Sequence, residues 1–334
     1  MEKKFILSTF QLDESAKARL IESLPNEWEY RTEGEIGEDG LGKVEILLLS
    51  GMWLTKERIL PLKNLRMIQS FSAGMDHINF SIIPPEVIVC SNAGAFAGPI
   101  AEFVMGATIS LGRNLAFHDR GMREGKFIRT PPGLYLRGKT IGIIGTGGIG
   151  QATAKLAKCF GMRTMGVNTT GNAVPNFDSV TTLDGLNTLL SESDVILVAT
   201  PLTVKTKNLL GRKEFRLVKP NCIIVNVARG AIINEEALYE FLRDHPDAKA
   251  ALDVWWRYPK TGDETVAQDY PISSLPNVLS SPHFSDGVDK QTKLGSDSAV
   301  DNIIRYLKKN EQLKGIVRRE DYFGLNVPKA HPTP

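Results

Sequence analysis

Residues Thr140–Asn168 read TIGIIGTGGIGQATAKLAKCFGMRTMGVN, and this stretch decides the fold of the chain. Its apolar start, residues 141–144, is typical of a buried parallel strand. A glycine-rich turn, residues 145–150, follows directly and leads into a helical pattern whose candidate buried stripe is Ala152, Leu156, Ala157 and Phe160. A second predicted strand, residues 163–167, ends at Asn168. The order strand, G-x-G-x-x-G, helix, strand is the context in which this motif binds a dinucleotide.

The three motif glycines meet different steric demands. Gly145 permits the tight turn, Gly147 lets the backbone approach a pyrophosphate, and Gly150 lets the helix pack against the strand. The helix start then presents N–H groups and the positive end of its dipole to the phosphate. We therefore expect the cofactor to contact Gly145, Gly147, Gly148, Ile149 and Gly150.

The composition is that of an ordinary globular protein. The chain has 334 residues, of which 42% are hydrophobic and 23% charged, so it is long enough for two domains with sizeable cores. Its 40 basic and 38 acidic side chains balance to a net charge of +2, which favours neither nucleic acid nor a membrane as a partner. No Cys/His cluster has the spacing of a metal site, so we expect no bound metal.

Three features indicate a cytoplasmic protein. The three cysteines, Cys90, Cys159 and Cys222, are far apart and in apolar company, as expected for buried free thiols in a reducing compartment. The first residues lack the apolar core and the cleavage site of a secretory signal. No apolar run approaches the length of a membrane span.

Strands and helices alternate along the rest of the chain, which predicts parallel sheets and an α/β fold. Before the glycine-rich turn, strands are predicted at 5–9, 44–49, 67–71 and 87–90. After it, they are predicted at 163–167, 194–199, 222–227, 250–254 and 279–281. Helical patterns cover 14–23, 55–59, 99–120, 234–243 and 290–309. The helix from residue 99 is expected to bridge into the nucleotide-binding part.

Two short loops before the bridging helix contain glycine. They are Ser72–Asp76 and Ser91–Ala95, and both follow predicted strands. Open α/β sheets bind ligands at the carboxyl ends of their strands, where glycine can expose N–H groups to an anion. Plain turn formation explains these loops equally well.

Two side chains are the best candidates for chemistry. Among the five histidines, His283 alone follows a buried strand at the edge where the other loops gather, which suits an acid–base group beside a nicotinamide. Arg229 stands at another strand end, in an apolar context where a solvated arginine is unusual. Its guanidinium fork suits a substrate carboxylate, and a structural ion pair is the alternative.

Several further motifs stand in a fixed order along the chain. They are Ser72-Ala73-Gly74-Met75-Asp76, Asn92-Ala93-Gly94 leading into Ala101-Glu102, Thr200-Pro201-Leu202, Asn226-Val227-Ala228-Arg229-Gly230, Leu252-Asp253-Val254 and Ser281-Pro282-His283. With these motifs and the glycine-rich turn, essentially the whole chain resembles the D-isomer-specific 2-hydroxyacid dehydrogenases. This family includes phosphoglycerate, glycerate and formate dehydrogenases.

The resemblance implies a fold of two doubly wound parallel-sheet domains, with a Rossmann nucleotide domain inserted into a flavodoxin-like substrate domain. The expected limits are 1–98 for the first part of the substrate domain, 99–285 for the nucleotide domain, and 286–334 for the return helix and tail. Members are usually homodimers that close a cleft between the two domains.

The resemblance also implies roles for residues. Arg229 would bind the substrate carboxylate, and His283 would shuttle the proton. Backbone N–H groups of Ala73 and Gly74 would help to hold the carboxylate. Further cofactor contacts are expected at Thr200, Pro201, Ala228 and Asp253, the last on the side of the nicotinamide carboxamide.

The chain departs from the family pattern beside the histidine. The family commonly has a glutamate five residues after the position of Asp253, where it orients and charges the histidine. Here Tyr258 stands at that position, so we group it with the catalytic candidates. Glu264 and Asp286 are the alternatives for the missing acid.

A second departure concerns the choice of cofactor. An NAD site usually has Asp or Glu at the end of the second strand, bonded to the ribose hydroxyls. This chain has Asn168, followed by Thr169 and Thr170. Because no fixed negative charge repels a 2′-phosphate, we favour NADP over NAD, although no adjacent arginine completes a phosphate clamp.

These observations predict an NAD(P)-dependent oxidoreductase that interconverts a small 2-oxo acid and its D-2-hydroxy acid. Two rivals remain: an NAD(P)-sensing binding protein with weak or no turnover, and an enzyme similar to formate dehydrogenase. The sequence leaves open which 2-hydroxy acid is used and in which direction. It also leaves open whether Met52, Trp255 and Trp256 line the substrate pocket or pack in the core.

Overall fold

The computed structural model describes residues 3–259, 267–309 and 311–325. Contacts within the chain divide it into two compact units. Unit 1 joins the residues before Ala97 to those after Gly287, and unit 2 is Ala97–Gly287. The assignment of substrate binding to unit 1 and of nucleotide binding to unit 2, with limits at 98/99 and 285/286, stays a prediction.

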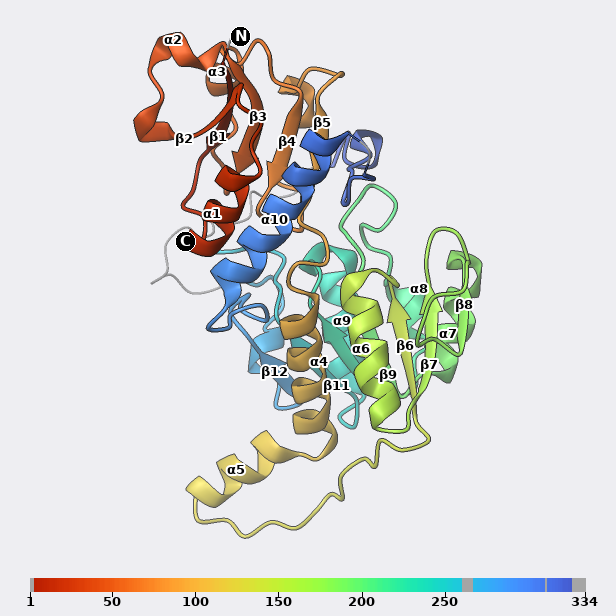
Figure 1. Cartoon of the computed structure of the whole chain (residues 1–334). Helices are drawn as coiled ribbons and strands as arrows, with labels where there is room; N and C mark the ends of the chain where they lie inside the picture. The colour runs from red at the N-terminus through yellow and green to blue at the C-terminus, as the bar shows by residue number, and fades with distance from the viewer. Residues whose placement is uncertain (1–2, 260–266, 310, 326–334) are drawn as a thin grey trace. The chain divides into compact units, whose positions relative to one another are not determined.

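Unit 1 is built on a sheet of five parallel strands in the order β2-β1-β3-β4-β5. The strands are β1 Lys4–Ser8, β2 Trp28–Thr32, β3 Val44–Leu49, β4 Met67–Ser70 and β5 Ile88–Cys90. The helices are α1 Glu14–Glu22, α2 Glu38–Leu41, α3 Lys56–Ile59 and α10 Gln291–Lys308. This strand order is that of the flavodoxin-like fold. Helices α1 and α10 lie side by side and share one core with the strands, although they are far apart in sequence (Figure 1).

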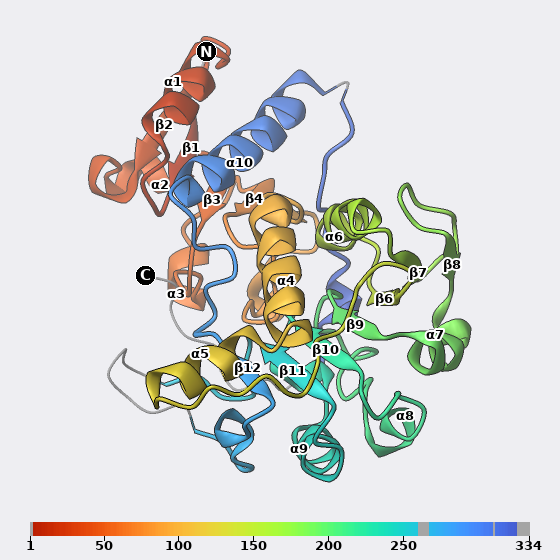
Figure 2. The same ribbon diagram turned by 90° about the horizontal axis from the view of Figure 1, so that it is seen from below.

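Unit 2 is built on a sheet of seven parallel strands in the order β12-β11-β10-β9-β6-β7-β8. The strands are β6 Thr140–Ile144, β7 Arg163–Val167, β8 Ser179–Thr181, β9 Val195–Val198, β10 Ile223–Asn226, β11 Lys249–Leu252 and β12 Val278–Ser280. The helices are α4 Ala97–Gly112, α5 Leu115–Arg123, α6 Gly148–Cys159, α7 Leu186–Glu192, α8 Arg212–Phe215 and α9 Glu235–Asp244. Figure 2 shows α4 and α6 on one face of the sheet and α7, α8 and α9 on the other. The chain order reverses at β6, as in a Rossmann fold, so the predicted fold class is confirmed.

The bridging helix expected at 99–120 is in fact two helices. Helix α4 ends at Gly112, and Asn114 then adopts a left-handed conformation with φ 57°. Asparagine tolerates this conformation better than most residues. The ammonium group of Lys249 donates to the carbonyl of Leu111 at 2.8 Å and thereby caps the end of α4. The break redirects the chain into α5.

The buried face of α6 also differs from the expected stripe of Ala152, Leu156, Ala157 and Phe160. Ala157 is buried and Leu156 packs partly buried against the core, but Phe160 is 41% exposed. The fully buried side chains of α6 are those of Thr153, Ala154 and Ala157. These side chains are small, so α6 can approach α4 closely in the core that both helices share with the sheet.

The cysteines divide into two classes. Cys90 and Cys222 are buried, and burial raises the pKa of the Cys90 thiol to about 11 and that of Cys222 further still. Cys159 is exposed near the end of α6, so the expectation that it is buried was wrong. None of the described helices combines the length and apolar character that a membrane crossing needs. Within the described ranges, no group of His, Cys, Asp and Glu side chains is arranged to hold a metal ion.

Candidate active site

The candidate residues of unit 2 lie at one end of its sheet, where the strands finish. All seven strands are parallel, so the loops that follow them all start from this carboxyl end. Taken across the sheet from β7 to β12, these loops carry Asn168, the glycine-rich turn, Thr200 and Pro201, Ala228 and Arg229, Asp253, and His283. Residues that are distant in sequence therefore lie side by side at the carboxyl end of the sheet, in an order set by the strands.

The glycine-rich turn has the geometry that a phosphate-binding loop needs. Gly145 has φ 101°, and a Cβ there would lie 2.6 Å from the carbonyl oxygen of Ala199. A Cβ on Gly150 would collide with the carbonyl oxygen of Gly145. At Gly147, which precedes α6, nothing lies within 4 Å of the Cβ position. This open cradle at a helix N-terminus fits a dinucleotide pyrophosphate.

Asn168 organises the turn after β7. Its side-chain amide donates to the hydroxyl of Thr146 at 2.8 Å, which ties this turn to the glycine-rich loop. Its side-chain oxygen accepts from the backbone N–H groups of Thr170 at 3.0 Å and Gly171 at 2.6 Å. Thr169 and Thr170 are exposed. The position expected to select the cofactor is thus also a structural link between two loops.

Hydrogen bonds of threonine side chains hold the loop after β9 in shape. The hydroxyl of Thr206 donates to the carbonyl oxygen of Pro201 at 2.7 Å and accepts from the N–H of Thr203 at 2.8 Å. Thr203 is buried, Thr200 is half-buried and Pro201 is exposed. These bonds hold residues 201–206 in a compact turn directly after β9.

Asn226 shapes the loop that carries Arg229. At the end of β10, its buried side chain accepts from the N–H of Ala228 at 3.1 Å and donates to the carbonyl oxygen of Arg229 at 3.0 Å. The half-buried guanidinium group donates to the carbonyl oxygen of Ala228 at 2.8 Å, which limits its freedom. The sequence indicated Arg229 but not the side chain that holds its backbone.

The segment after β11 packs between its two neighbours. A Cβ on Gly230 would lie 2.4–2.6 Å from the backbone of Trp255 and Trp256, so only glycine allows the Arg229 loop to approach so closely. The indole N–H of Trp256 donates to the carbonyl oxygen of Ile233 at 2.7 Å, and that of Trp255 donates to Ser281 at 3.0 Å. The two tryptophans therefore brace the loops after β10 and β12, and Trp255 is 5% exposed.

Asp253 contacts the loop of His283 directly. Its side chain is fully buried, and its two oxygens accept from the N–H groups of Phe284 at 2.8 Å and Ser285 at 3.1 Å. His283 itself is exposed and has a left-handed backbone with φ 61°. Sequence reasoning associated Asp253 with the cofactor and missed this link, because the link depends on two strands becoming neighbours.

Tyr258 lies against His283. The two rings are 5.2 Å apart between centroids, with 33° between their planes. The hydroxyl of Tyr258 accepts from the N–H of Trp255 at 3.2 Å. The aromatic ring thus contacts the imidazole where relatives were expected to supply a carboxylate. Of the two alternative acids, Asp286 is half-buried in the turn after His283, and Glu264 lies outside the described residues.

The two glycine-containing loops of unit 1 lie together at the end of its sheet. The N–H of Asn92 donates to the carbonyl oxygen of Ser72 at 3.0 Å, and its buried side chain donates to Phe71 and Gly295 at 3.0 Å. Ala73 is exposed and Gly74 is half-buried in this arrangement. Asn92 thus joins both loops to α10, which the sequence did not reveal.

Comparison with known proteins gives consistent matches. The family model described as D-isomer specific 2-hydroxyacid dehydrogenase, NAD binding domain, matches residues 105–285. Hydroxypyruvate reductase from Thermotoga maritima is 35% identical over 269 residues, which cover 79% of this chain and 85% of the reductase. D-3-phosphoglycerate dehydrogenase from Methanocaldococcus jannaschii is 33% identical over 291 residues, or 82% of this chain. The match covers 54% of that relative, so the chain spans about half its length.

A solved structure extends the likeness to the whole fold. The D-isomer specific 2-hydroxyacid dehydrogenase family protein from Aeromonas salmonicida superposes with a TM-score of 0.77 at 28% identity, over 95% of this chain and 99% of that protein. The family model and the Thermotoga maritima relative each cover more than half of the present chain. The chain belongs to the D-isomer specific 2-hydroxyacid dehydrogenase family.

Proposed function

We propose that this protein is an oxidoreductase that interconverts a small 2-oxo acid and its D-2-hydroxy acid with a nicotinamide cofactor. One observation carries the proposal: the Arg229 loop and the His283 loop are both fastened to the same segment after β11. Gly230 packs on the backbone of that segment, and Asp253 binds the N–H groups beside His283. A cation and an acid–base group on adjacent loops suit a substrate with a carboxylate next to a carbonyl.

Each residue has a defined task in this proposal. The guanidinium of Arg229 binds the carboxylate and stabilises negative charge that develops on the adjacent oxygen. The protonated imidazole of His283 gives a proton to that oxygen during reduction and takes it back during oxidation. The cradle at Gly147 and the N-terminus of α6 hold the pyrophosphate. When bound, the cofactor donates or accepts the hydride.

We favour NADP over NAD as the cofactor. The support is the uncharged edge of the ribose site, where Asn168 is followed by the exposed hydroxyls of Thr169 and Thr170. An aspartate or glutamate at Asn168 would repel a 2′-phosphate. The description of the matching family model refers to NAD binding, so both cofactors belong in the test.

The names of the relatives guide the choice of substrates. One relative is called hydroxypyruvate reductase and another D-3-phosphoglycerate dehydrogenase, so short polar 2-oxo acids head the panel. The deciding experiment offers hydroxypyruvate, glyoxylate, pyruvate and bulkier 2-oxo acids with NADH and with NADPH, and follows nicotinamide absorbance. Oxidation of at least one coenzyme by at least one 2-oxo acid is expected, and its absence across the panel would contradict the proposal.

Tyr258 favours a second candidate, a nucleotide-sensing protein with little turnover. The ring contact with His283 offers no negative charge to sustain an imidazolium. In that case the coenzyme binds with measurable affinity while every 2-oxo acid, and formate in the oxidative direction, leaves it unchanged. Binding by fluorescence, measured alongside turnover, separates the two candidates.

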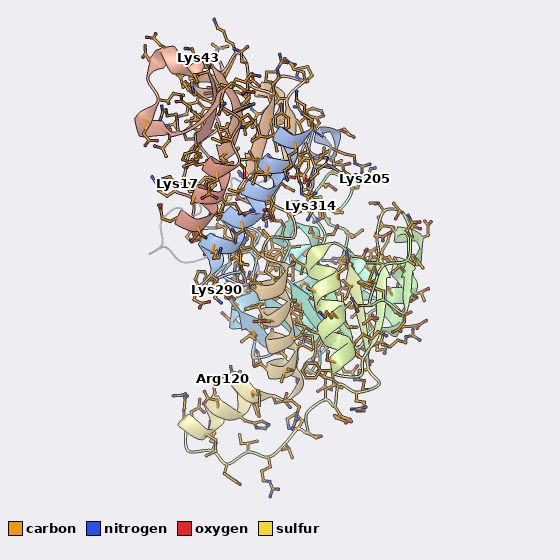
Figure 3. All side chains as sticks on the ribbon, viewed as in Figure 1. Lys17, Lys43, Arg120, Lys205, Lys290 and Lys314 are labelled. Carbon is orange, nitrogen blue, oxygen red and sulfur yellow. The ribbon has the colours of Figure 1, made fainter. Side chains whose placement is uncertain are left out.

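We further propose that the protein is a homodimer in a reducing, cytoplasmic compartment. Helix α5 projects from unit 2 in Figure 1, and Figure 3 shows its side chains, with Arg120 labelled. On α5 and the segment after it, Leu115, Met122, Phe127 and Tyr135 are 53%, 57%, 79% and 70% exposed. An apolar surface of this kind is typical of a protein–protein contact. The absence of disulfides among the three cysteines supports the reducing compartment.

A further inference from the structure

We propose that Asp253 is a positioning residue, which fixes the loop that carries His283 and thereby sets the placement of the imidazole. The inference rests on the proposed function, because it assigns His283 the proton transfer. It departs from the expectation that Asp253 acts as a contact to the nicotinamide carboxamide.

The first support is the way Asp253 is itself held. It follows β11 directly, and its N–H donates to the carbonyl oxygen of Asn226 at 3.1 Å, so its backbone continues the pairing with β10. Its side chain has no exposed surface. A buried carboxylate is costly unless hydrogen bonds replace its water, and the N–H groups of Phe284 and Ser285 do so.

The second support is that the His283 loop is fastened on both sides of the histidine. Before it, the N–H of Ser281 donates to Leu252 at 2.9 Å, and the carbonyl of Ser281 accepts from the indole of Trp255. After it, the next two N–H groups bind Asp253. With both flanks anchored, the turn is completed within residues 282–283.

The third support is the backbone of His283. Its φ of 61° is unusual for a residue other than glycine, and such conformations persist where the surroundings impose them. Charge-assisted bonds from a rigid carboxylate to the two following N–H groups provide that constraint. The same constraint brings the imidazole against the ring of Tyr258.

The test compares Asp253→Asn with the full-length parent protein. The amide keeps the size of the side chain but presents an NH₂ group to one of the two N–H donors. We expect faster hydrogen exchange at the amides of Phe284 and Ser285, and a fall in kcat on the order of 100-fold, as for a reacting group displaced by about an ångström. The KM for the 2-oxo acid and the Kd for the coenzyme should stay close to those of the parent.

Asp194→Asn is the matched control. Asp194 also accepts a backbone N–H, from Thr140 at 2.9 Å, but it lies at the opposite end of the same sheet. This control should leave kcat and exchange at residues 284–285 unchanged. If Asp253→Asn fails to fold, Asp253→Glu serves instead, since it keeps the charge but moves both oxygens.

Two results would overturn the proposal. One is a coenzyme Kd that rises by as much as kcat/KM falls, with exchange at residues 284–285 unchanged, which would make Asp253 a cofactor contact. The other is parental kcat with parental exchange. If the parent protein itself turns over no 2-oxo acid, the proposed function fails. Faster exchange in Asp253→Asn would then still support the positioning role, and unchanged exchange would refute it.

Discussion

The backbone of Arg229 is held by the side chain of Asn226, which does not depend on the guanidinium group. The guanidinium group itself donates to the carbonyl of Ala228. In Arg229→Ala, kcat/KM should fall by about a hundredfold or more, because charge-assisted hydrogen bonds are worth about 1.5–3 kcal/mol each. The kcat/KM of Arg229→Lys should lie between those of the parent and of Arg229→Ala, since lysine keeps the charge without the two-pronged geometry of the guanidinium group. Urea unfolding should give near-parental midpoints for both variants. An Arg229→Ala protein that is unfolded, or that keeps parental kcat/KM, would contradict the role of Arg229 in binding the substrate carboxylate.

Asn168→Asp should shift coenzyme preference towards NADH. The new carboxylate can still accept the N–H groups of Thr170 and Gly171, so the turn should survive, and the hydroxyl of Thr146 can donate to it. The negative charge would face a 2′-phosphate but accept ribose hydroxyls. The control is Asn172→Asp, which adds the same charge at an exposed position of the same loop. The KM values for NADH and NADPH decide; an unchanged ratio in Asn168→Asp would remove this residue as the selector.

Tyr258→Glu should alter the pH dependence of reduction. Reduction needs protonated His283, so its rate falls as pH rises through the pKa of the imidazole. A carboxylate beside the ring favours the imidazolium and raises that pKa, so the falling limb of kcat/KM should move to higher pH. Tyr258→Phe keeps the ring contact without a charge and should leave the limb in place. A limb that stays put in Tyr258→Glu would mean that another acid already serves His283.

At the scale of elements, the junction between α4 and α5 depends on a single left-handed residue. Asn114 donates to the carbonyl oxygen of Pro131 at 3.2 Å and contacts the ammonium group of Lys249. Both Asn114→Ala and Asn114→Gly lose these bonds, but only alanine also bears the strain of φ 57°. The alanine variant should therefore be less stable than the glycine variant by about 1–2 kcal/mol. Urea unfolding measures this difference, and equal stabilities would mean that the junction relaxes.

The elements also show what sequence patterns can and cannot predict. Buried strands such as β6 and β10 were predicted almost to the residue, because continuous apolar runs between turns have few other interpretations. Strands β2 and β8 were missed. Both are edge strands, and Trp28–Thr32 alternates buried aromatic with charged residues over only five positions. A pattern so short is recognisable only beside the strand with which it pairs.

The same limit applies to the candidate site. Motif residues such as Arg229 and His283 stand out because their residue types are unusual after buried strands. Asn226 and Asn92, which hold the backbones of the loops, carry no such signal. The bonds of Asn226 stay within its own loop and follow from the local turn, whereas those of Asn92 and Asp253 run to segments distant in sequence that only the fold brings together. The tyrosine at position 258 was found through the family pattern, but its ring contact with His283 required coordinates.

At the scale of the whole molecule, the proposed dimer is directly testable. Light scattering after size exclusion should give twice the mass of one chain. Phe127→Glu combined with Tyr135→Glu should halve it, because charge replaces two highly exposed apolar groups beside α5. Leu60→Glu, at a residue that is 72% exposed in unit 1, is the control and should leave the mass unchanged. A native mass of one chain, or a variant that keeps the doubled mass, contradicts the proposed contact.

Unit 1 is assembled from two separate stretches of the chain, and this affects the order in which the protein folds during synthesis. Ile6, Leu20 and Met67 share one core with Ala299, Val300 and Ile303 of α10. A ribosome releases the sheet of unit 1 first but supplies this helix only after all of unit 2 has been made. During synthesis, the first ninety or so residues therefore expose the apolar face that α10 later covers. Unit 2 can complete its core before unit 1 does, although unit 1 begins earlier in the chain. A nascent chain stalled before α10 should recruit chaperones through that face, and one stalled after it should not.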